Sequence, residues 1–341
     1  MPAVKNRRWT LAARPHGLVK ESDFRMEEVP APVAGDGEVL VRVLYLSFDP
    51  TQRGWIEDRP SYMPPVQIGE VMRASAVGEV VESKHPGFAK GDRVQGLFGW
   101  QEYAVLPGAM LGPNAKIPAG VPPTWPLGVL GITGLTAYFG MLDLGQPKAG
   151  DTVVVSGAAG ATGSVAGQIA KLEGARVIGI AGGPDKCAWL TKEAHFDAAI
   201  DYKNEDVSAR LREVCPKGID VYFDNVGGAI LDACLEQIAL RARIVLCGAI
   251  SSYNEVEPPP GPRNLMRLVV QRGRMEGFIV IDYLPRFGEG VAKLSEWVRA
   301  GKITHAEDVQ HGIENAPKTL LRLFSGANFG KQVLQVAEPS A

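Results

Sequence analysis

The stretch VVVSGAAGATGSVAGQIAK, residues 153–171, places a glycine-rich turn directly between a β-branched run and a segment of helical period. A strand, a glycine turn and a helix in this order favour a βαβ unit whose turn holds the phosphates of a dinucleotide. The spacing is Ala158-x-Gly160-x-x-Gly163, with Ala158 in the first glycine slot. Gly160 would let the backbone approach the pyrophosphate, and Gly163 would allow the helix to pack closely on the strand.

The start of this helix, at Ala161 and Thr162, offers backbone amides and a positive dipole end to the phosphates. The alternative is a tight strand–helix turn that binds nothing. A P-loop is excluded, because no Gly-Lys-Ser/Thr follows the glycines.

The end of the next predicted strand indicates which dinucleotide is bound. NAD-binding sites of this kind carry a carboxylate there for the ribose 2′-hydroxyl. Here Gly182 and Gly183 occupy the position and Lys186 follows, so we favour NADP over NAD. The adjacent carboxylate of Asp185 weakens the preference for NADP, because it would repel a 2′-phosphate. The alternative for Lys186 is a solvated lysine at the start of a helix, with no part in cofactor binding.

The first part of the chain is rich in predicted strands, and the second part alternates predicted strands and helices. The predicted fold class is therefore α/β. The runs 37–49, 76–83 and 91–106 predict a β-rich, barrel-like domain, and prolines cluster in 117–128. Beyond them, apolar strands at 151–156, 175–182, 219–226, 242–250 and 273–282 alternate with helices at 163–174, 184–194 and 284–301. This alternation predicts a doubly wound parallel sheet. We expect residues 1–127 to form the first domain, completed by 302–341 with a helix, loop and strand over 316–336, and 128–301 to form the second.

Composition excludes several classes of function. The 341 residues carry a net charge of −2, which provides no field for nucleic acid or an acidic membrane. No run of about 18 apolar residues occurs, and the N-terminal segment lacks the apolar core of a signal peptide. Four cysteines, at 187, 215, 234 and 247, form no C-x-x-C pair, so we expect free thiols and a cytoplasmic location.

A catalytic zinc needs about three protein ligands of Cys, His or Glu type. No cysteine occurs before residue 187, and the predicted first domain offers only His16 and His85. Glu70, in QIGEVMRASAVGEV, lacks partners of ligand type. The sequence therefore predicts chemistry without a metal.

Several motifs together resemble the medium-chain dehydrogenase/reductase superfamily. They are residues 130–171, DYKNED (201–206), YFDNVGG (222–228) and ANFGKQVLQV (327–336). Within it, the chain resembles the zinc-free branch of prostaglandin reductases, leukotriene B4 dehydrogenases and alkenal double-bond reductases, including the bacterial curcumin-reductase-like members. This resemblance implies a GroES-like barrel beside a Rossmann domain. It also implies NADPH-dependent reduction of the C=C bond of α,β-unsaturated ketones or aldehydes.

That reaction delivers a hydride to the β-carbon while negative charge gathers on the carbonyl oxygen, where a hydrogen-bond donor lowers the barrier. Tyr253, in CGAISSYNE, follows a strand that should end at the ligand-binding edge of the sheet, and the resemblance places a substrate-facing tyrosine in this motif. Tyr253 either donates the proton or orients the substrate, with the ribose 2′-hydroxyl or water as the donor. The alternative is a loop tyrosine packed on its neighbours. Where the family often has Asp-Pro-Tyr, this chain has Thr51, which leaves the substrate range open, and Gln52 and Arg53 follow.

The resemblance also implies further cofactor contacts: Thr133 near the carboxamide, Tyr202 near the 2′-phosphate or adenosine ribose, Asn225 near the nicotinamide ribose, the backbone of Phe278 and Val280 at the carboxamide, and Asn328 and Lys331 on the phosphate side. The alternatives are helix capping for Thr133, an Asx-turn for Asn225, strand core for Phe278 and Val280, and a C-cap turn at Asn328 and Gly330.

The basic segment 263–274 carries four arginines but no aromatic residues for base stacking, so an amphipathic helix at the contact of a homodimer is favoured over nucleic-acid binding. The partner we expect is a small enone or enal. Two alternatives remain, a quinone oxidoreductase and a non-catalytic NADPH-binding protein.

Overall fold

The computed structural model describes residues 4–112 and 115–340, and this part of the chain divides into two compact units. Unit 1 extends to Leu127 and is completed by Asp308–Asn328 and by the residues from Gln332 onward. Unit 2 comprises Gly128–Glu307 and Phe329–Lys331. The chain leaves unit 2 at residue 307, later than the predicted boundary at 301. The reason is that Ile303 is buried and Gln168 holds Thr304 by two hydrogen bonds, of 2.8 Å each.

Unit 1 contains two β-sheets. Strands β1 (Lys5–Leu11) and β2 (Phe24–Pro30) pair with each other. The larger sheet has the order β13-β14-β3-β4-β5, with β6 on β3. Its strands are β3 (Glu38–Ser47), β4 (Ala76–Ser83), β5 (Arg93–Gly96), β6 (Tyr103–Pro107), β13 (Glu307–His311) and β14 (Lys331–Gln335). Its helices are α1 (Gln52–Trp55), α2 (Gly108–Leu111) and α10 (Ala316–Ser325). The core centres on Trp100, whose ring lies 5.0 Å from Phe24 and 5.2 Å from Phe48.

Unit 2 is a parallel sheet of six strands in the order β12-β11-β10-β7-β8-β9. The strands are β7 (Thr152–Ser156), β8 (Arg176–Ala181), β9 (Ala198–Asp201), β10 (Ile219–Asp224), β11 (Ile238–Leu246) and β12 (Arg274–Gly277). All five residues of β7 are buried, as expected for a central strand covered on both faces.

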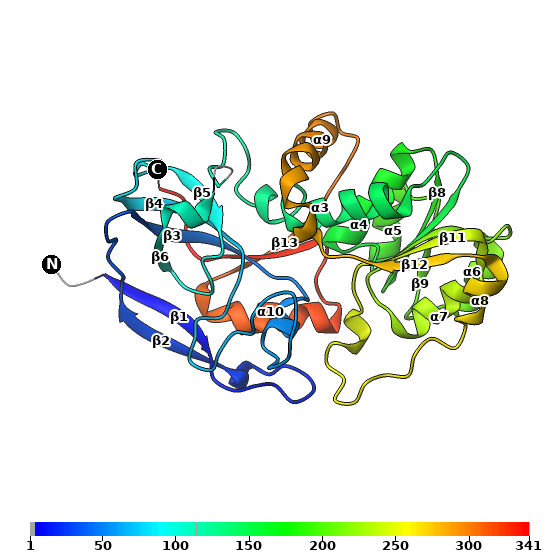
Figure 1. Ribbon diagram of the computed structural model, residues 1–341, viewed down its shortest axis with the longest axis horizontal. Coiled ribbons are helices and arrows are strands. Elements are labelled where there is room, and N and C mark those ends of the chain that lie inside the picture. Colours follow the sequence, from blue (N-terminus) through cyan, green and yellow to red (C-terminus); the bar gives the residue numbers. More distant parts are fainter. Residues whose placement is uncertain (1–3, 113–114, 341) are drawn as a thin grey trace. The chain divides into compact units, whose positions relative to one another are not determined.

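Helices cover both faces of this sheet. Figure 1 shows α3, α4 and α5 gathered on one side of the strands and α6, α7 and α8 on the other. These helices are α3 (Ile132–Phe139), α4 (Ala161–Leu172), α5 (Pro184–Lys192), α6 (Val207–Val214), α7 (Gly228–Glu236) and α8 (Met266–Gln271), and α9 (Phe287–Arg299) follows β12. The order of the strands reverses between β7 and β10: β8 and β9 are added on one side of β7, and β10, β11 and β12 on the other. Doubly wound sheets bind ligands at this point.

The α/β fold class predicted from the sequence is confirmed, with local corrections. The predicted strand 273–282 is wrong in its second half: β12 ends at Gly277, and Val280 begins a 3-10 helix that runs to Arg286. The run 91–106 is two strands, β5 and β6, because the intervening segment turns inward to bury Trp100. The helix expected within 263–274 is limited to α8. Within the described ranges, each helix is too short or too polar to cross a membrane.

Candidate active site

Most of the predicted site residues come together at one edge of the unit 2 sheet. Because all six strands run parallel, the segments that follow them emerge at the same edge. That edge collects Ala158, Gly160, Ala161, Thr162 and Gly163 after β7, Gly182 and Lys186 after β8, Tyr202 after β9, Asn225 after β10, Tyr253 after β11, and Phe278 and Val280 after β12.

The glycine-rich turn after β7 is fixed by close backbone packing. Gly157 has a φ of +58°, and Gly160 is the N-cap of the 12-residue helix α4 without a side-chain capping bond. A Cβ atom on Gly163 would lie 2.4 Å from the carbonyl oxygen of Gly157, so this glycine allows α4 to start directly against the strand. Gly163 and Ala158 are buried, whereas Gly160 and the first helical residues are partly exposed. The accessible groups of the turn are therefore the amides of an uncapped helix N-terminus, which attract anions.

The turn after β8 has no carboxylate at the end of the strand. Gly183 has a φ of +100°, and its N–H donates a 2.7 Å hydrogen bond to Asp201 at the end of β9. Asp201 also accepts bonds from the Lys203 N–H (3.1 Å) and the Asn204 amide (2.7 Å). The Gly183 bond leads the interactions that lower the pKa of Asp201, so this carboxylate shapes the turn as an anion. Sequence reasoning missed Asp201.

Tyr202 lies directly over the backbone of this turn. A Cβ atom on Gly182 would come within 2.9 Å of the Tyr202 ring and hydroxyl, so only glycine leaves room for the ring. Tyr202 is 44% exposed. It lines a cavity of about 300 Å³ whose other lining residues are Asp206, Val207, Ser208, Ala229, Ile230 and Ala233. Lys186 lies in the first turn of α5 and is partly exposed.

Asn225 is tied to the end of β7. Its side-chain amide donates a 2.7 Å bond to the Ser156 carbonyl, and its N–H donates a 2.9 Å bond to the Ser156 hydroxyl. The expected alternative, an Asx-turn made by Asn225, is wrong. The neighbouring Asp224 closes this turn instead, because its carboxylate accepts from the N–H groups of Val226 (3.0 Å) and Gly227 (2.9 Å).

Tyr253 ends a short 3-10 turn, Ile250–Ser252, beyond β11. Its phenol oxygen accepts a 3.2 Å hydrogen bond from the Ala249 N–H, and it would lie 3.0 Å from a Cβ atom at Gly248. The hydroxyl is therefore held above its own loop at the carboxyl end of the sheet.

Three other predicted cofactor residues have local packing partners. The Thr133 hydroxyl donates a 3.0 Å bond to the Gly128 carbonyl at the start of α3. Phe278 packs over Gly140, where a Cβ atom would lie 2.5 Å from the ring. Val280 is buried at the start of a 3-10 helix, so the alternative that placed it in a strand core is wrong.

The segment Phe329–Lys331 lies against the glycine-rich turn. The Gly330 N–H donates a 3.0 Å bond to the Ala159 carbonyl, and the Phe329 ring packs edge-on against Trp189 at 5.4 Å. Lys331 is buried at 3% exposure, and its N–H donates to the Ala306 carbonyl at 2.8 Å.

Asn328, in contrast, belongs to unit 1. The suggested C-cap turn at Asn328 and Gly330 is wrong, because helix α10 ends earlier, at Gly326 with a φ of +65°.

In unit 1, the Thr51 hydroxyl contacts the hydroxyl of Tyr62, which also accepts a 3.2 Å bond from the Trp55 indole. A phenol hydroxyl therefore lies beside the position where the family often has tyrosine, which sequence reasoning missed because Tyr62 comes from a later loop. Gln52 and Arg53 are buried at 1% and 2% exposure, and Arg53 pairs with Glu57 at 2.7 Å.

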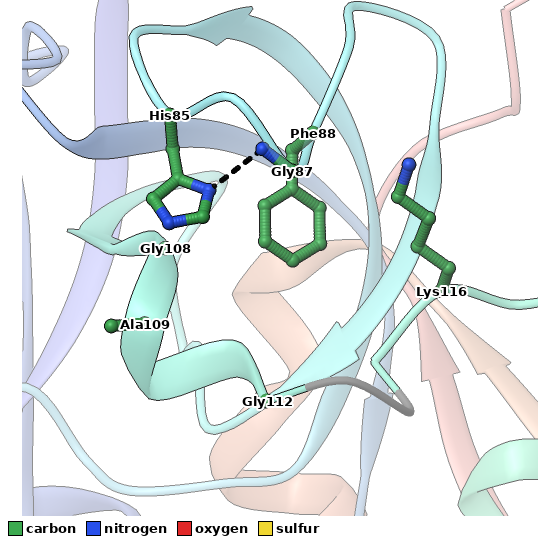
Figure 2. Close-up of a pocket in the computed structure, with 7 residues that line it drawn as sticks. All are labelled: His85, Gly87, Phe88, Gly108, Ala109, Gly112 and Lys116. Carbon is green, nitrogen blue, oxygen red and sulfur yellow. Dashed lines mark hydrogen bonds between the residues drawn. The ribbon is translucent and has the colours of Figure 1, made fainter.

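A second cavity of about 300 Å³ lies in unit 1, lined by His85, Gly87, Phe88, Gly108, Ala109, Gly112 and Lys116. Figure 2 shows the His85 ring turned toward its own loop, where Nδ1 accepts a 3.1 Å bond from the Gly87 N–H. None of the predicted site residues lines this cavity. Over residues 4–112 and 115–340, no group of three or more His, Cys, Asp or Glu side chains has the arrangement of a metal site.

Comparison with known proteins identifies the family. Residues 7–113 match a model described as the N-terminal domain of oxidoreductase, and residues 161–296 match one described as zinc-binding dehydrogenase. The chain is 47% identical over 338 residues to the NADPH-dependent curcumin reductase of Escherichia coli, covering 98% of this chain and 97% of that protein. It is 42% identical over 341 residues to the NADP(+)-dependent 2-alkenal reductase of Nicotiana tabacum, covering 98% of each.

A solved structure agrees with these matches. The crystal structure of CurA from Vibrio vulnificus in complex with NADPH has a TM-score of 0.92 and 44% identity, covering 98% of this chain and 100% of that one. The resemblance predicted from the sequence is thus confirmed: the chain belongs to the medium-chain dehydrogenase/reductase superfamily, in the branch of the curcumin and alkenal reductases.

Proposed function

We propose that the protein reduces the C=C bond of α,β-unsaturated ketones or aldehydes with NADPH, without a metal. The protein is an NADP-dependent oxidoreductase, and NADP(H) is its cofactor. The observation that carries the proposal is the convergence of three features at one edge of the sheet: the glycine-rich turn after β7, the Gly182–Gly183 turn after β8, and Tyr253 after β11.

The sheet edge fits a dinucleotide with an additional phosphate. The uncapped start of α4 offers its amides to a diphosphate, and Gly160 leaves the approach open. A 2′-phosphate suits the turn after β8, because the strand ends in Gly182 and Gly183 and Lys186 supplies a positive charge. Tyr202 and its cavity provide a surface for the adenosine half. Thr133, Asn225, Phe278, Val280, Asn328 and Lys331 are proposed for the remaining contacts.

When bound, NADPH supplies the hydride that reduces the β-carbon of the substrate. Tyr253 then has one of two roles in the proposal. Its hydroxyl either donates a hydrogen bond to the carbonyl oxygen, where negative charge accumulates, or orients the enone for protonation at the α-carbon by another donor. The reduction would also need one proton at the α-carbon, which the protein or water would supply.

Initial-rate assays with a simple enone, such as but-3-en-2-one, test the proposal. We expect NADPH oxidation that depends on the enone, formation of the saturated ketone, and a much lower kcat/KM with NADH. A parallel assay with 1,4-benzoquinone distinguishes a quinone reductase. Oxidation of NADPH by the quinone alone, or saturable NADPH binding with no turnover of either compound, would contradict the proposal.

We also propose that the protein is a cytoplasmic homodimer. The four cysteines are free, which suits a reducing compartment, and a thiol reagent should find four thiols in the unfolded chain. Detection of fewer than four thiols would contradict this location.

Strand β12 is an edge strand, and α8 exposes Met266, Val269 and Val270 at 67%, 66% and 55%. An open strand edge beside exposed apolar side chains favours pairing with a second copy.

A further inference from the structure

We infer that Asp224 is a positioning residue that holds three loops of the cofactor site in one arrangement. In the proposed reaction Asp224 itself contacts neither the substrate nor the cofactor. Asp224 is the last residue of β10, and Ser156 is the last residue of the adjacent strand β7. Both are buried, at 1% and 0% exposure. This inference rests on the proposed function, because the loops matter only if a cofactor binds there.

The first observation is the number of donors that meet one carboxylate oxygen. Asp224 Oδ1 accepts from the hydroxyls of Ser156 (2.8 Å) and Tyr222 (2.7 Å) and from the N–H groups of Val226 and Gly227. The last two donors belong to the turn that leads into α7, whose positive N-terminal end favours a negative charge at this point. A buried carboxylate is stable only with such compensation.

The second observation is that the same residue reaches the other two loops. Ser156, held by Asp224, ends the strand before the glycine-rich turn, and its hydroxyl also accepts from the Asn225 N–H at 2.9 Å. The Asp224 backbone carbonyl accepts from the N–H groups of Cys247 (2.9 Å) and Gly248 (3.0 Å), at the base of the Tyr253 loop. Asp224 thus connects the ends of β7, β10 and β11.

Two further hydrogen bonds join the Tyr253 loop to the turn after β10. The Ser251 hydroxyl and N–H both donate to the Val226 carbonyl, at 2.6 and 3.1 Å, so the loop that bears Tyr253 rests on the turn that Asp224 closes. A change at the carboxylate would therefore displace the cofactor turn and the Tyr253 loop together.

The third observation is that the other oxygen, Oδ2, is buried and has no hydrogen-bond partner among the described residues. All four donors converge on Oδ1, so the position of this one atom is linked to both strand ends and to the turn that leads into α7.

The test compares three variants that each remove part of this cluster. Asp224→Asn keeps the shape but removes the charge, and Ser156→Ala removes the hydroxyl that bridges two loops. Tyr222→Phe is the matched control, because it deletes a donor to the same oxygen that comes from within the strand and holds no loop. Thermal melting and NADPH titration by fluorescence are measured for each, together with kcat and KM for the enone.

We expect all three variants to lower the melting temperature. Asp224→Asn and Ser156→Ala should also raise the NADPH dissociation constant at least tenfold and lower kcat at saturating NADPH, since small displacements of a site are costly. Tyr222→Phe should keep the dissociation constant within about twofold of the wild type. If Asp224→Asn does not fold, Ser156→Ala alone carries the comparison with the control.

Equal NADPH affinity and kcat in all variants, with only the melting temperature changed, would overturn the positioning role. Wild-type protein that fails to bind NADPH would instead overturn the proposed function, so the two failures are distinguishable.

Discussion

At the scale of single residues, Tyr253 is where the chemistry of the proposal is tested. Tyr253→Phe keeps the ring but removes the hydroxyl, so kcat with an enone should fall about 10²-fold if the phenol stabilises charge on the carbonyl oxygen. The NADPH dissociation constant should remain within twofold. Stopped-flow or steady-state kinetics and NADPH titration measure the two quantities.

The control for this variant is Tyr103→Phe, in β6 of unit 1, which removes a tyrosine hydroxyl outside the proposed site. Tyr253→Phe also loses the hydrogen bond from the Ala249 N–H. This loss should lower the free energy of unfolding only slightly, because the bond is partly exposed. An unchanged kcat in Tyr253→Phe would remove Tyr253 from the reaction.

Residues that form sequence-local patterns could be predicted, and residues that depend on strand pairing could not. The glycines at 160 and 163 and the tyrosine at 253 stand in short motifs that follow apolar runs, so the sequence locates them. Asp224 was noted only as part of a motif, because its bond to Ser156 depends on which strands are neighbours. The same holds for Asp201 at the end of β9, whose partner Gly183 follows β8 and lies 18 residues away. Tyr62 was missed for another reason, because it reaches Thr51 from a loop 11 residues later.

At the scale of elements, the close packing of α4 on β7 fixes the conformation in which the glycine-rich turn is proposed to bind NADPH. In Gly163→Ala the new Cβ atom would lie 2.4 Å from the Gly157 oxygen and 3.0 Å from the Ala158 Cα atom. Both are backbone atoms, so the helix must shift. We expect unfolding in urea to show a loss of about 1–3 kcal/mol, and we expect NADPH affinity to fall at least tenfold.

Gly288→Ala is the matched control, because Gly288 lies in the first turn of α9 and its Cβ position is open. Alanine there should leave stability unchanged or raise it slightly, and NADPH affinity should not change. Similar losses of affinity in both variants would show that the close contact at 163 is not the cause.

At the scale of the whole molecule, the proposed homodimer predicts a particle of twice the chain mass in solution. Val269→Glu places a charge on the exposed apolar face of α8 and should shift the particle toward the monomer in light scattering. Val33→Glu is the control, since Val33 is 75% exposed in unit 1. A wild-type protein that is monomeric at micromolar concentration would contradict the dimer.

The contact between Gly330 and the glycine-rich turn has a consequence for biosynthesis. The turn comes first in the sequence, and the Gly330 N–H that donates a hydrogen bond to its Ala159 carbonyl is added 171 positions later. A nascent polypeptide on the ribosome therefore lacks this bond until Gly330 has been synthesised. Any product released before Gly330 is added would have the glycine-rich turn without the hydrogen bond to its Ala159 carbonyl.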